Sequence, residues 1–169
     1  MNHLIIVLMG VSGSGKTTVG ELLSAKTGLP FYDGDDFHPA ANVEKMAHNI
    51  PLTDEDRAGW LADLATHVGQ WEQSTGAILA CSALKESYRQ TLQAGAQAPI
   101  HWVFLTGSPE LLLQRMQGRQ GHYMHPAMLA SQLDTLEVPG YGLHLDVAHT
   151  PPELVAQIRQ WLEPAPGQP

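Results

Sequence analysis

A glycine-rich segment near the start of the chain constrains the fold more than any other feature of the sequence. Residues Gly10–Thr17 read G-V-S-G-S-G-K-T and match the phosphate-loop pattern G-x-x-x-x-G-K-[ST] at every defined position. The apolar run Leu4–Met9 precedes this segment, and a helical pattern from Gly15 to about Thr27, stopped by Gly28, follows it. This strand–loop–helix context predicts a loop that binds the phosphates of a nucleotide, because a chance glycine-rich turn would not satisfy pattern and context together.

Each residue type in this loop has a chemical task. Glycines let the backbone curl so that successive N–H groups point at an anion, and the dipole of the following helix adds positive potential. Lys16 can reach the β- and γ-phosphates of ATP, and the hydroxyl of Thr17 can ligate Mg²⁺. The candidate nucleotide-binding residues are therefore Gly10, Val11, Ser12, Gly13, Ser14, Gly15, Lys16, Thr17 and Thr18.

Short apolar runs alternate with longer helical patterns along the rest of the chain. Such alternation implies right-handed crossovers and a mostly parallel sheet, with ligands at the carboxyl ends of its strands. We therefore expect a three-layer α/β fold in one domain over residues 1–163, followed by a flexible tail at 164–169. The expected strands are Leu4–Met9, Leu29–Tyr32, Ala77–Cys81, His101–Leu105 and Leu143–Val147, and the expected helices cover about 15–27, 54–74, 108–117 and 154–162.

The charge and the cysteine content exclude several classes of function. Lys and Arg total 9 whereas Asp and Glu total 17, which gives a net charge of −8 at pH 7. A chain of this charge is not expected to bind nucleic acid or an anionic membrane surface. The run Leu4–Met9 is too short to span a bilayer, and Cys81, the only cysteine, has no partner for an intrachain disulfide. We therefore expect a cytoplasmic protein in a reducing environment.

Two carboxylates follow the second expected strand. Asp33 and Asp35 are two residues apart, and in extended chain this spacing places them on the same side. Asp35 could accept a proton from a substrate hydroxyl, and Asp33 could hold a water molecule bound to Mg²⁺. The alternative is a polar loop whose acids only cap the next helix. The neighbouring phosphate loop favours the first interpretation, because phosphoryl transfer needs a group that orients the attacking oxygen.

Four of the few cations occur in two pairs, Lys85 with Arg89 and Arg115 with Arg119. Within each pair the residues are four apart in a helical pattern. Like charges at this spacing destabilise a helix by about 0.2–0.5 kcal/mol. The spacing favours an anion such as ATP or an acidic substrate near each pair, although neighbouring acids on a solvated face would explain it too. The stretch around and after Arg119 is polar and contains glycine, and we expect it to form a mobile lid at about 118–126.

Six segments between the N-terminus and residue 137 form a combination that is more specific than the phosphate loop alone. They are GVSGSGKTTVG (Gly10–Gly20), FYDGDDFHPAANVEKM (Phe31–Met46), PLTDEDRAGWL (Pro51–Leu61), ACSALKESYRQTL (Ala80–Leu92), RMQGRQGHYM (Arg115–Met124) and SQLDTLE (Ser131–Glu137). With these segments the chain resembles the small bacterial-type gluconokinases, within the shikimate-kinase-like group of P-loop kinases. The resemblance implies a parallel five-stranded sheet and a cytoplasmic enzyme, often a homodimer, that uses ATP and Mg²⁺ to phosphorylate D-gluconate at its 6-hydroxyl.

The resemblance also implies roles for individual residues. Carried over by position, Asp35 deprotonates or orients the acceptor hydroxyl, Asp33 lies on the metal side, and Arg119 reaches the transferring phosphoryl group from the lid. Lys16 would stabilise the same charge. The remaining implied contacts are Arg115 over the adenine and His38, Arg57, Lys85 and Arg89 at the substrate.

The sequence departs from the family pattern at a few positions. Asn49 replaces a usual glycine, Gly59 replaces a usual proline at the start of the long helix, and Tyr123 replaces a usual phenylalanine. The third strand ends in Cys81-Ser82 without an aspartate, so the second metal contact depends on Asp33 or water.

Two other functions stay open at this point. The chain could be a kinase for another small anionic acceptor, such as shikimate or a nucleoside monophosphate. It could also be a nucleotide-binding module without transfer activity. The paired aspartates and the lack of the guanine signature N-K-x-D count against such a module.

Overall fold

Five parallel strands form one sheet at the centre of the computed structural model, which describes residues 2–118 and 126–164. Their order across the sheet is β2-β3-β1-β4-β5, and every neighbouring pair is parallel. The α/β fold expected from the sequence is therefore confirmed. The strands are β1 (Ile5–Met9), β2 (Phe31–Asp33), β3 (Ala77–Ala80), β4 (His101–Thr106) and β5 (Leu143–Asp146).

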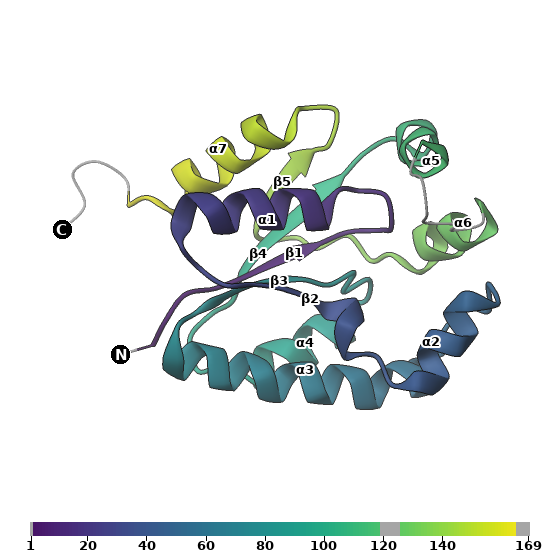
Figure 1. The fold of residues 1–169 in the computed structure, drawn as a ribbon, viewed down its shortest axis with the longest axis horizontal. Coiled ribbons are helices and arrows are strands. Elements are labelled where there is room, and N and C mark those ends of the chain that lie inside the picture. Colours follow the sequence, from purple (N-terminus) through teal and green to yellow (C-terminus); the bar gives the residue numbers. More distant parts are fainter. Residues whose placement is uncertain (1, 119–125, 165–169) are drawn as a thin grey trace.

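Helices cover both faces of this sheet, which makes three layers (Figure 1). One face carries α1 (Lys16–Thr27) and α7 (Pro151–Leu162), and the other carries α3 (Asp54–Ser74) and α4 (Glu86–Ala94). Every residue of β1 and β3 is buried, because these central strands have helices on both sides. Because helices cover both faces of these strands, the strands appear in the sequence as continuous apolar runs.

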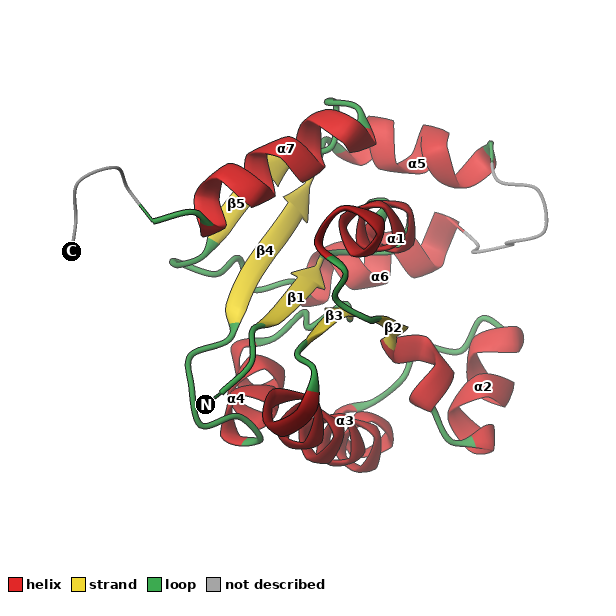
Figure 2. Cartoon of the chain, turned by 60° about the vertical axis from the view of Figure 1, so that its left-hand side comes forward, coloured by secondary structure: helices red, strands yellow, loops and turns green. Residues whose placement is uncertain are grey.

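Three shorter helices lie at the end of the molecule towards which the strands point (Figure 2). They are α2 (Ala40–Ala47), α5 (Pro109–Gln117) and α6 (Pro126–Thr135). A short 3-10 helix, η1 (Gly34–Phe37), leaves the end of β2 directly. The patterns in the sequence did not predict α2, α6 or η1.

Polar side chains cap the starts of α3, α5 and α7. The Thr53 hydroxyl accepts from the N–H of Asp56 at the start of α3, and the Asp56 carboxylate accepts from the N–H of Thr53. Thr150 and Glu153 make the same reciprocal pair at the start of α7. The Ser108 hydroxyl accepts from the N–H of Leu111 and caps α5.

The edge strands differ most from the expected ones. β2 begins at Phe31 instead of Leu29, because Gly28 ends α1 in the left-handed region and Pro30 has no N–H to donate. In β5 only Leu145 is buried, so this strand lacks the continuous apolar run of the central ones.

Part of the expected organisation falls on residues that are not described. The predicted lid at 118–126 lies outside the described residues except at its two ends, and so does the predicted tail beyond Pro164. Among the helices in the described ranges, none combines the length and apolar character that crossing a membrane requires.

Candidate active site

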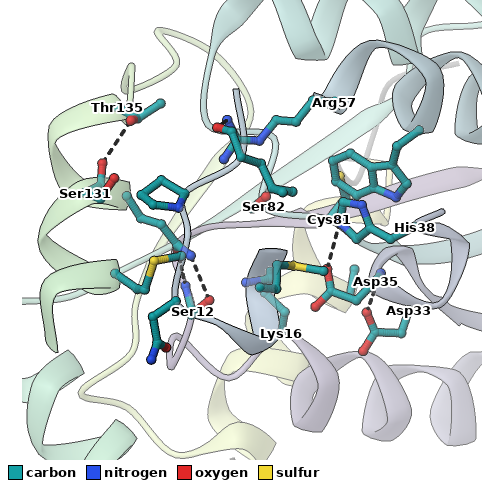
Figure 3. Close-up of a pocket in the computed structure, with 18 residues that line it drawn as sticks. Ser12, Lys16, Asp33, Asp35, His38, Arg57, Cys81, Ser82, Ser131 and Thr135 are labelled. Carbon is teal, nitrogen blue, oxygen red and sulfur yellow. Dashed lines mark hydrogen bonds and ion pairs between the residues drawn. The ribbon is translucent and has the colours of Figure 1, made fainter. Parts of the chain in front are cut away.

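A pocket lies at the carboxyl ends of the central strands, where a parallel α/β sheet places its ligands (Figure 3). The phosphate loop, η1, the start of α3 and α6 surround it. In Figure 3 the side chains of Asp33, Asp35 and His38 lie together beside Lys16. The polar residues of the lining include Ser12, Lys16, Asp33, Asp35, His38, Asn49, Arg57, Ser82, Ser131, Gln132 and Thr135.

The phosphate loop has the backbone geometry that its sequence predicts. Gly13 and Gly15 adopt φ values of 82° and 95°, in the region that side chains disfavour. A Cβ at Gly13 would lie 2.7 Å from Cγ of Met116, so the position is also closed to larger residues. The buried hydroxyl of Ser14 has no hydrogen-bond partner among the described residues, which fits a loop built for an anion.

Lys16 lies against the loop that contains it. Its ammonium donates to the carbonyl oxygens of Gly10 and Val11, at 2.9 and 3.1 Å. The same side chain lines the pocket together with Asp33 and Asp35. The positive charge is therefore held between the loop and the carboxylates, where the γ-phosphate of a bound nucleotide is expected.

Two oxygen ligands that suit Mg²⁺ are hydrogen-bonded to each other, and one of them, Asp33, lines the pocket. The Thr17 hydroxyl donates to Oδ2 of Asp33 at 3.2 Å, and Oδ1 of Asp33 accepts from the N–H of Asp35 at 3.0 Å. Within the described residues no group of three or more His, Cys, Asp or Glu side chains is arranged to hold a metal ion. A hydroxyl and one carboxylate fit Mg²⁺, because this ion keeps several waters and shares phosphate oxygens.

Asp35 reaches the pocket by a different route from the expected one. The prediction that Asp33 and Asp35 share one side of an extended strand is wrong, because the strand ends at Asp33 and Asp35 lies in η1. The turn nevertheless brings both carboxylates to the pocket. The side chain of Asp35 stays 77% exposed, yet nearby protein atoms, and after them the charge of Asp33, raise the pKa of Asp35, while Lys16 lowers it.

His38 forms one wall of the pocket. Its ring stacks on Trp60, with ring centroids 4.0 Å apart, and Nε2 lies 3.7 Å from Oδ1 of Asp35. Only 3% of the side chain is exposed. Burial, followed by the positive charge of Arg57, lowers the pKa of His38 to about 4, so the imidazole is neutral near pH 7.

Arg57 presents part of its guanidinium to the pocket. Nη1 donates to the carbonyl oxygen of Leu52 at 2.8 Å and to the hydroxyl of Tyr88 at 3.2 Å, and Tyr88 in turn donates to Asp54. The guanidinium carbon lies 5.4 Å from the centre of the Tyr88 ring. Within the described part of the chain, Nε and Nη2 make no hydrogen bond and remain available to an oxygen-rich ligand.

Lys85 and Arg89 are not among the residues that line this pocket, and the structure explains the four-residue spacing of these two cations without a ligand. Lys85 precedes α4 and pairs with Asp54 at 3.0 Å. Arg89 is 2% exposed and donates to Glu86 at 2.8 Å and to the backbone oxygens of Ala83 and Glu137. Neither lines the pocket with Asp35. The expectation that their spacing reflects an anionic ligand is corrected, because each cation has its own acid.

Arg115 and Thr18 line a second hollow on the other side of the phosphate loop, together with Gly13, His149 and Pro151. This position fits the prediction that Arg115 lies beside a bound nucleotide. The helix ends at Gln117, so the expected four-residue spacing to Arg119 does not continue in α5. Arg119 lies outside the described residues.

Two polar contacts were not anticipated. Gln132 of α6 accepts from the N–H of Ser12 at 2.8 Å and donates to its hydroxyl at 3.1 Å, so it holds the phosphate loop. Asn42 of α2 is buried and lies 3.2 Å from Nδ1 of His38. Both residues lie in the segments that carry the family resemblance. Their position in these segments was the only feature of the sequence that could have indicated a role for them.

The two described departures from the family pattern are accommodated locally. Asn49 adopts φ of 56°, which explains why glycine is usual there and why asparagine, which tolerates this region, can replace it. Gly59 lies inside α3, and a Cβ there would meet nothing within 4 Å.

The fold and the site together define a P-loop kinase. A phosphate loop follows the central strand β1, a lysine lies on that loop, and two carboxylates stand at the end of β2 beside it.

Comparisons with known proteins define the family more narrowly. The profile of the AAA domain family matches residues 6–127. A gluconokinase from Gluconobacter oxydans (strain 621H) is 51% identical over 138 residues, which cover 80% of this chain and 76% of that protein. The chain belongs to the gluconokinase family.

Solved structures agree with this assignment. The unliganded structure of a sugar kinase from Janibacter sp. HTCC2649 has a TM-score of 0.90 at 40% identity, covering 96% of both chains. A gluconokinase structure from Sinorhizobium meliloti 1021 has a TM-score of 0.83 at 40% identity, covering 94% of this chain and 95% of that one.

Proposed function

We propose that this chain transfers the γ-phosphoryl group of ATP to the 6-hydroxyl of D-gluconate and releases 6-phospho-D-gluconate and ADP. The observation that carries the proposal is that one pocket joins Lys16 to the carboxylates of Asp33 and Asp35 and to the guanidinium of Arg57. Membership of the gluconokinase family supports the choice of acceptor.

The nucleotide would bind along the phosphate loop. The N–H groups of Gly10–Thr17 receive the phosphates, and the hollow beside Thr18 and Arg115 takes the adenosine side. Thr17 and Asp33 would hold Mg²⁺, which when bound neutralises phosphate charge.

The acceptor would lie between Arg57, His38 and Asp35. Arg57 offers Nε and Nη2 to the oxygens of the sugar acid, and the buried His38 adds a polar edge to the same wall. The carboxylate of Asp35 accepts the proton of the 6-hydroxyl as the bond from that oxygen to the γ-phosphorus forms. The bond from the γ-phosphorus to the bridging oxygen then breaks, and Lys16 and Arg119 stabilise the charge on the transferring group.

A coupled assay of ADP release with ATP, Mg²⁺ and D-gluconate tests the proposal. Shikimate and a nucleoside monophosphate serve as competing acceptors. We expect turnover with gluconate to exceed that with either competitor by at least a hundred-fold. Turnover with a competitor alone would favour another small-molecule kinase, and slow hydrolysis that no acceptor stimulates would favour a nucleotide-binding module.

Two variants assign the roles within this assay. Asp35→Asn should lower turnover by orders of magnitude while ATP binding survives, whereas Asp36→Asn, at the exposed neighbouring acid, serves as the matched control. Arg119→Ala should lower turnover more than nucleotide affinity. Equal turnover of wild type and Asp35→Asn would remove Asp35 from the chemistry.

Two further properties are inferred from the sequence, the cytoplasmic location from the cysteine content and the family resemblance, and the homodimer from the resemblance alone. The cytoplasmic location and the homodimeric assembly stay predictions, and sedimentation of the purified chain would test the assembly directly.

A further inference from the structure

Two neighbours, Trp60 and Asn42, fix the ring of His38. Trp60 stacks on one face with an interplanar angle of 16°, and its own Nε1–H donates to the carbonyl oxygen of Gly34 at 2.8 Å. Asn42, which is 3% exposed, places Nδ2 at 3.2 Å from Nδ1 of the histidine. The ring therefore has one nitrogen bound to the protein and the other turned to Asp35.

The partners of Asn42 decide which ring nitrogen carries the proton. Its Nδ2 atom also lies 2.8 Å from the backbone carbonyl oxygen of Asp56, which can only accept. The amide nitrogen, and not the amide oxygen, must therefore occupy this position. Its second hydrogen then points at Nδ1 of His38, which has to accept. A neutral imidazole that accepts at Nδ1 carries its proton on Nε2.

The Nε2–H group faces the pocket without a protein acceptor at hydrogen-bond length among the described residues. Its 3.7 Å separation from Oδ1 of Asp35 is too long for a hydrogen bond. The charged groups that act on the ring are Arg57 and Asp33, with Asp35 adjacent. Burial and Arg57 keep the ring neutral, as the lowered pKa of His38 indicates.

We propose that Asn42 is a positioning residue that holds His38 in the Nε2–H form, so that the ring donates a hydrogen bond to the acceptor hydroxyl beside Asp35. This inference rests on the proposed function. A hydroxyl oxygen has one proton and two lone pairs. If it accepts from His38 and gives its proton to Asp35, the remaining lone pair is left for the phosphorus. The histidine thus orients the nucleophile, and Asn42 determines that it does so as a donor.

Replacement of Asn42 by aspartate tests this role. The Asn42→Asp side chain is similar in size but cannot donate, so Nδ1 of His38 should take up a proton. We expect the ¹H–¹⁵N spectrum of the ring to change from the Nε2–H pattern to the Nδ1–H or the doubly protonated pattern. Turnover with gluconate should fall about ten- to a hundred-fold while KM for ATP stays unchanged.

Lys45→Met is the matched structural control. Lys45 lies on the same helix and holds Asp56 through an ion pair of 2.8 Å, so its loss loosens the packing of α2 on α3 without touching His38. This variant should keep both the Nε2–H spectrum and the turnover. If it instead reproduces both effects of Asn42→Asp, the role of Asn42 is structural and the proposal is wrong.

The ligand-free wild-type protein provides a measurement that needs no variant and no substrate. At pH 7 its spectrum should show His38 neutral with the proton on Nε2. A proton on Nδ1 would overturn the proposal even if gluconate is phosphorylated. If His38 shows the expected tautomer but the protein phosphorylates no sugar acid, the proposed function is wrong instead. Full turnover of Asn42→Asp with an altered tautomer would overturn the positioning role.

Discussion

Burial of His38 should make the stability of the fold depend on pH between about 4 and 6.5. The unfolded chain has the ordinary histidine pKa of 6.5, whereas the folded pKa of His38 is lowered to about 4. Between these values the unfolded state binds the extra proton, so the contribution of His38 to stability is complete above pH 6.5 and is lost as the pH falls towards 4. The difference of about 2.5 pKa units corresponds to at most about 3 kcal/mol, of which about 2 kcal/mol falls between pH 7 and pH 4.5.

Urea unfolding of wild type and His38→Gln over this pH range measures the effect. The wild-type free energy of unfolding should fall by about 2 kcal/mol more than that of the variant between pH 7 and pH 4.5. His3→Gln, at an exposed histidine, controls for the loss of a histidine as such. Parallel curves for wild type and His38→Gln would refute the reasoning, because they would mean that His38 titrates alike in the folded and unfolded chain.

Three more predictions follow from single contacts. Tyr88→Phe removes the hydroxyl that accepts from Arg57, so KM for gluconate should rise several-fold with KM for ATP unchanged, and steady-state kinetics will check this. Gly59→Ala should raise the free energy of unfolding by about 0.5–1 kcal/mol, measured in urea, because the site inside α3 has room for the methyl group. Burial raises the pKa of Cys81 to about 12, so iodoacetamide at pH 8 should modify it only after unfolding, as mass spectrometry will report.

The sequence predicted the central part of the fold well, because the signals there are local. The apolar runs of β1, β3 and β4 and the glycine pattern of the phosphate loop each lie within a few consecutive residues. The observed bounds of α3 agree with the predicted ones, since Thr53 and Asp56 mark its start and Leu61, Leu64 and Val68 define its buried side.

The roles of the cations could not be predicted in the same way, because several of their partners are distant in the chain. Arg89, whose acid Glu86 is three residues away, also donates to the backbone oxygen of Glu137 across 48 residues, and Lys85 pairs with the acid Asp54 across 31 residues. A spacing of four between two cations carries no information about such acids. Likewise, the two-residue spacing of Asp33 and Asp35 does not reveal that a 3-10 turn separates them.

Two polar side chains of the pocket, Arg57 and His38, share an arrangement. Arg57 binds the protein through Nη1 and has no described hydrogen bond at Nε and Nη2, and His38 binds Asn42 through Nδ1 and turns Nε2 towards Asp35. Each side chain is held at one end by the fold, so its other end keeps a fixed direction before any ligand arrives. Under the proposed mechanism, Asn42 touches no substrate but sets the geometry of His38, and its replacement should change turnover more than it changes the fold.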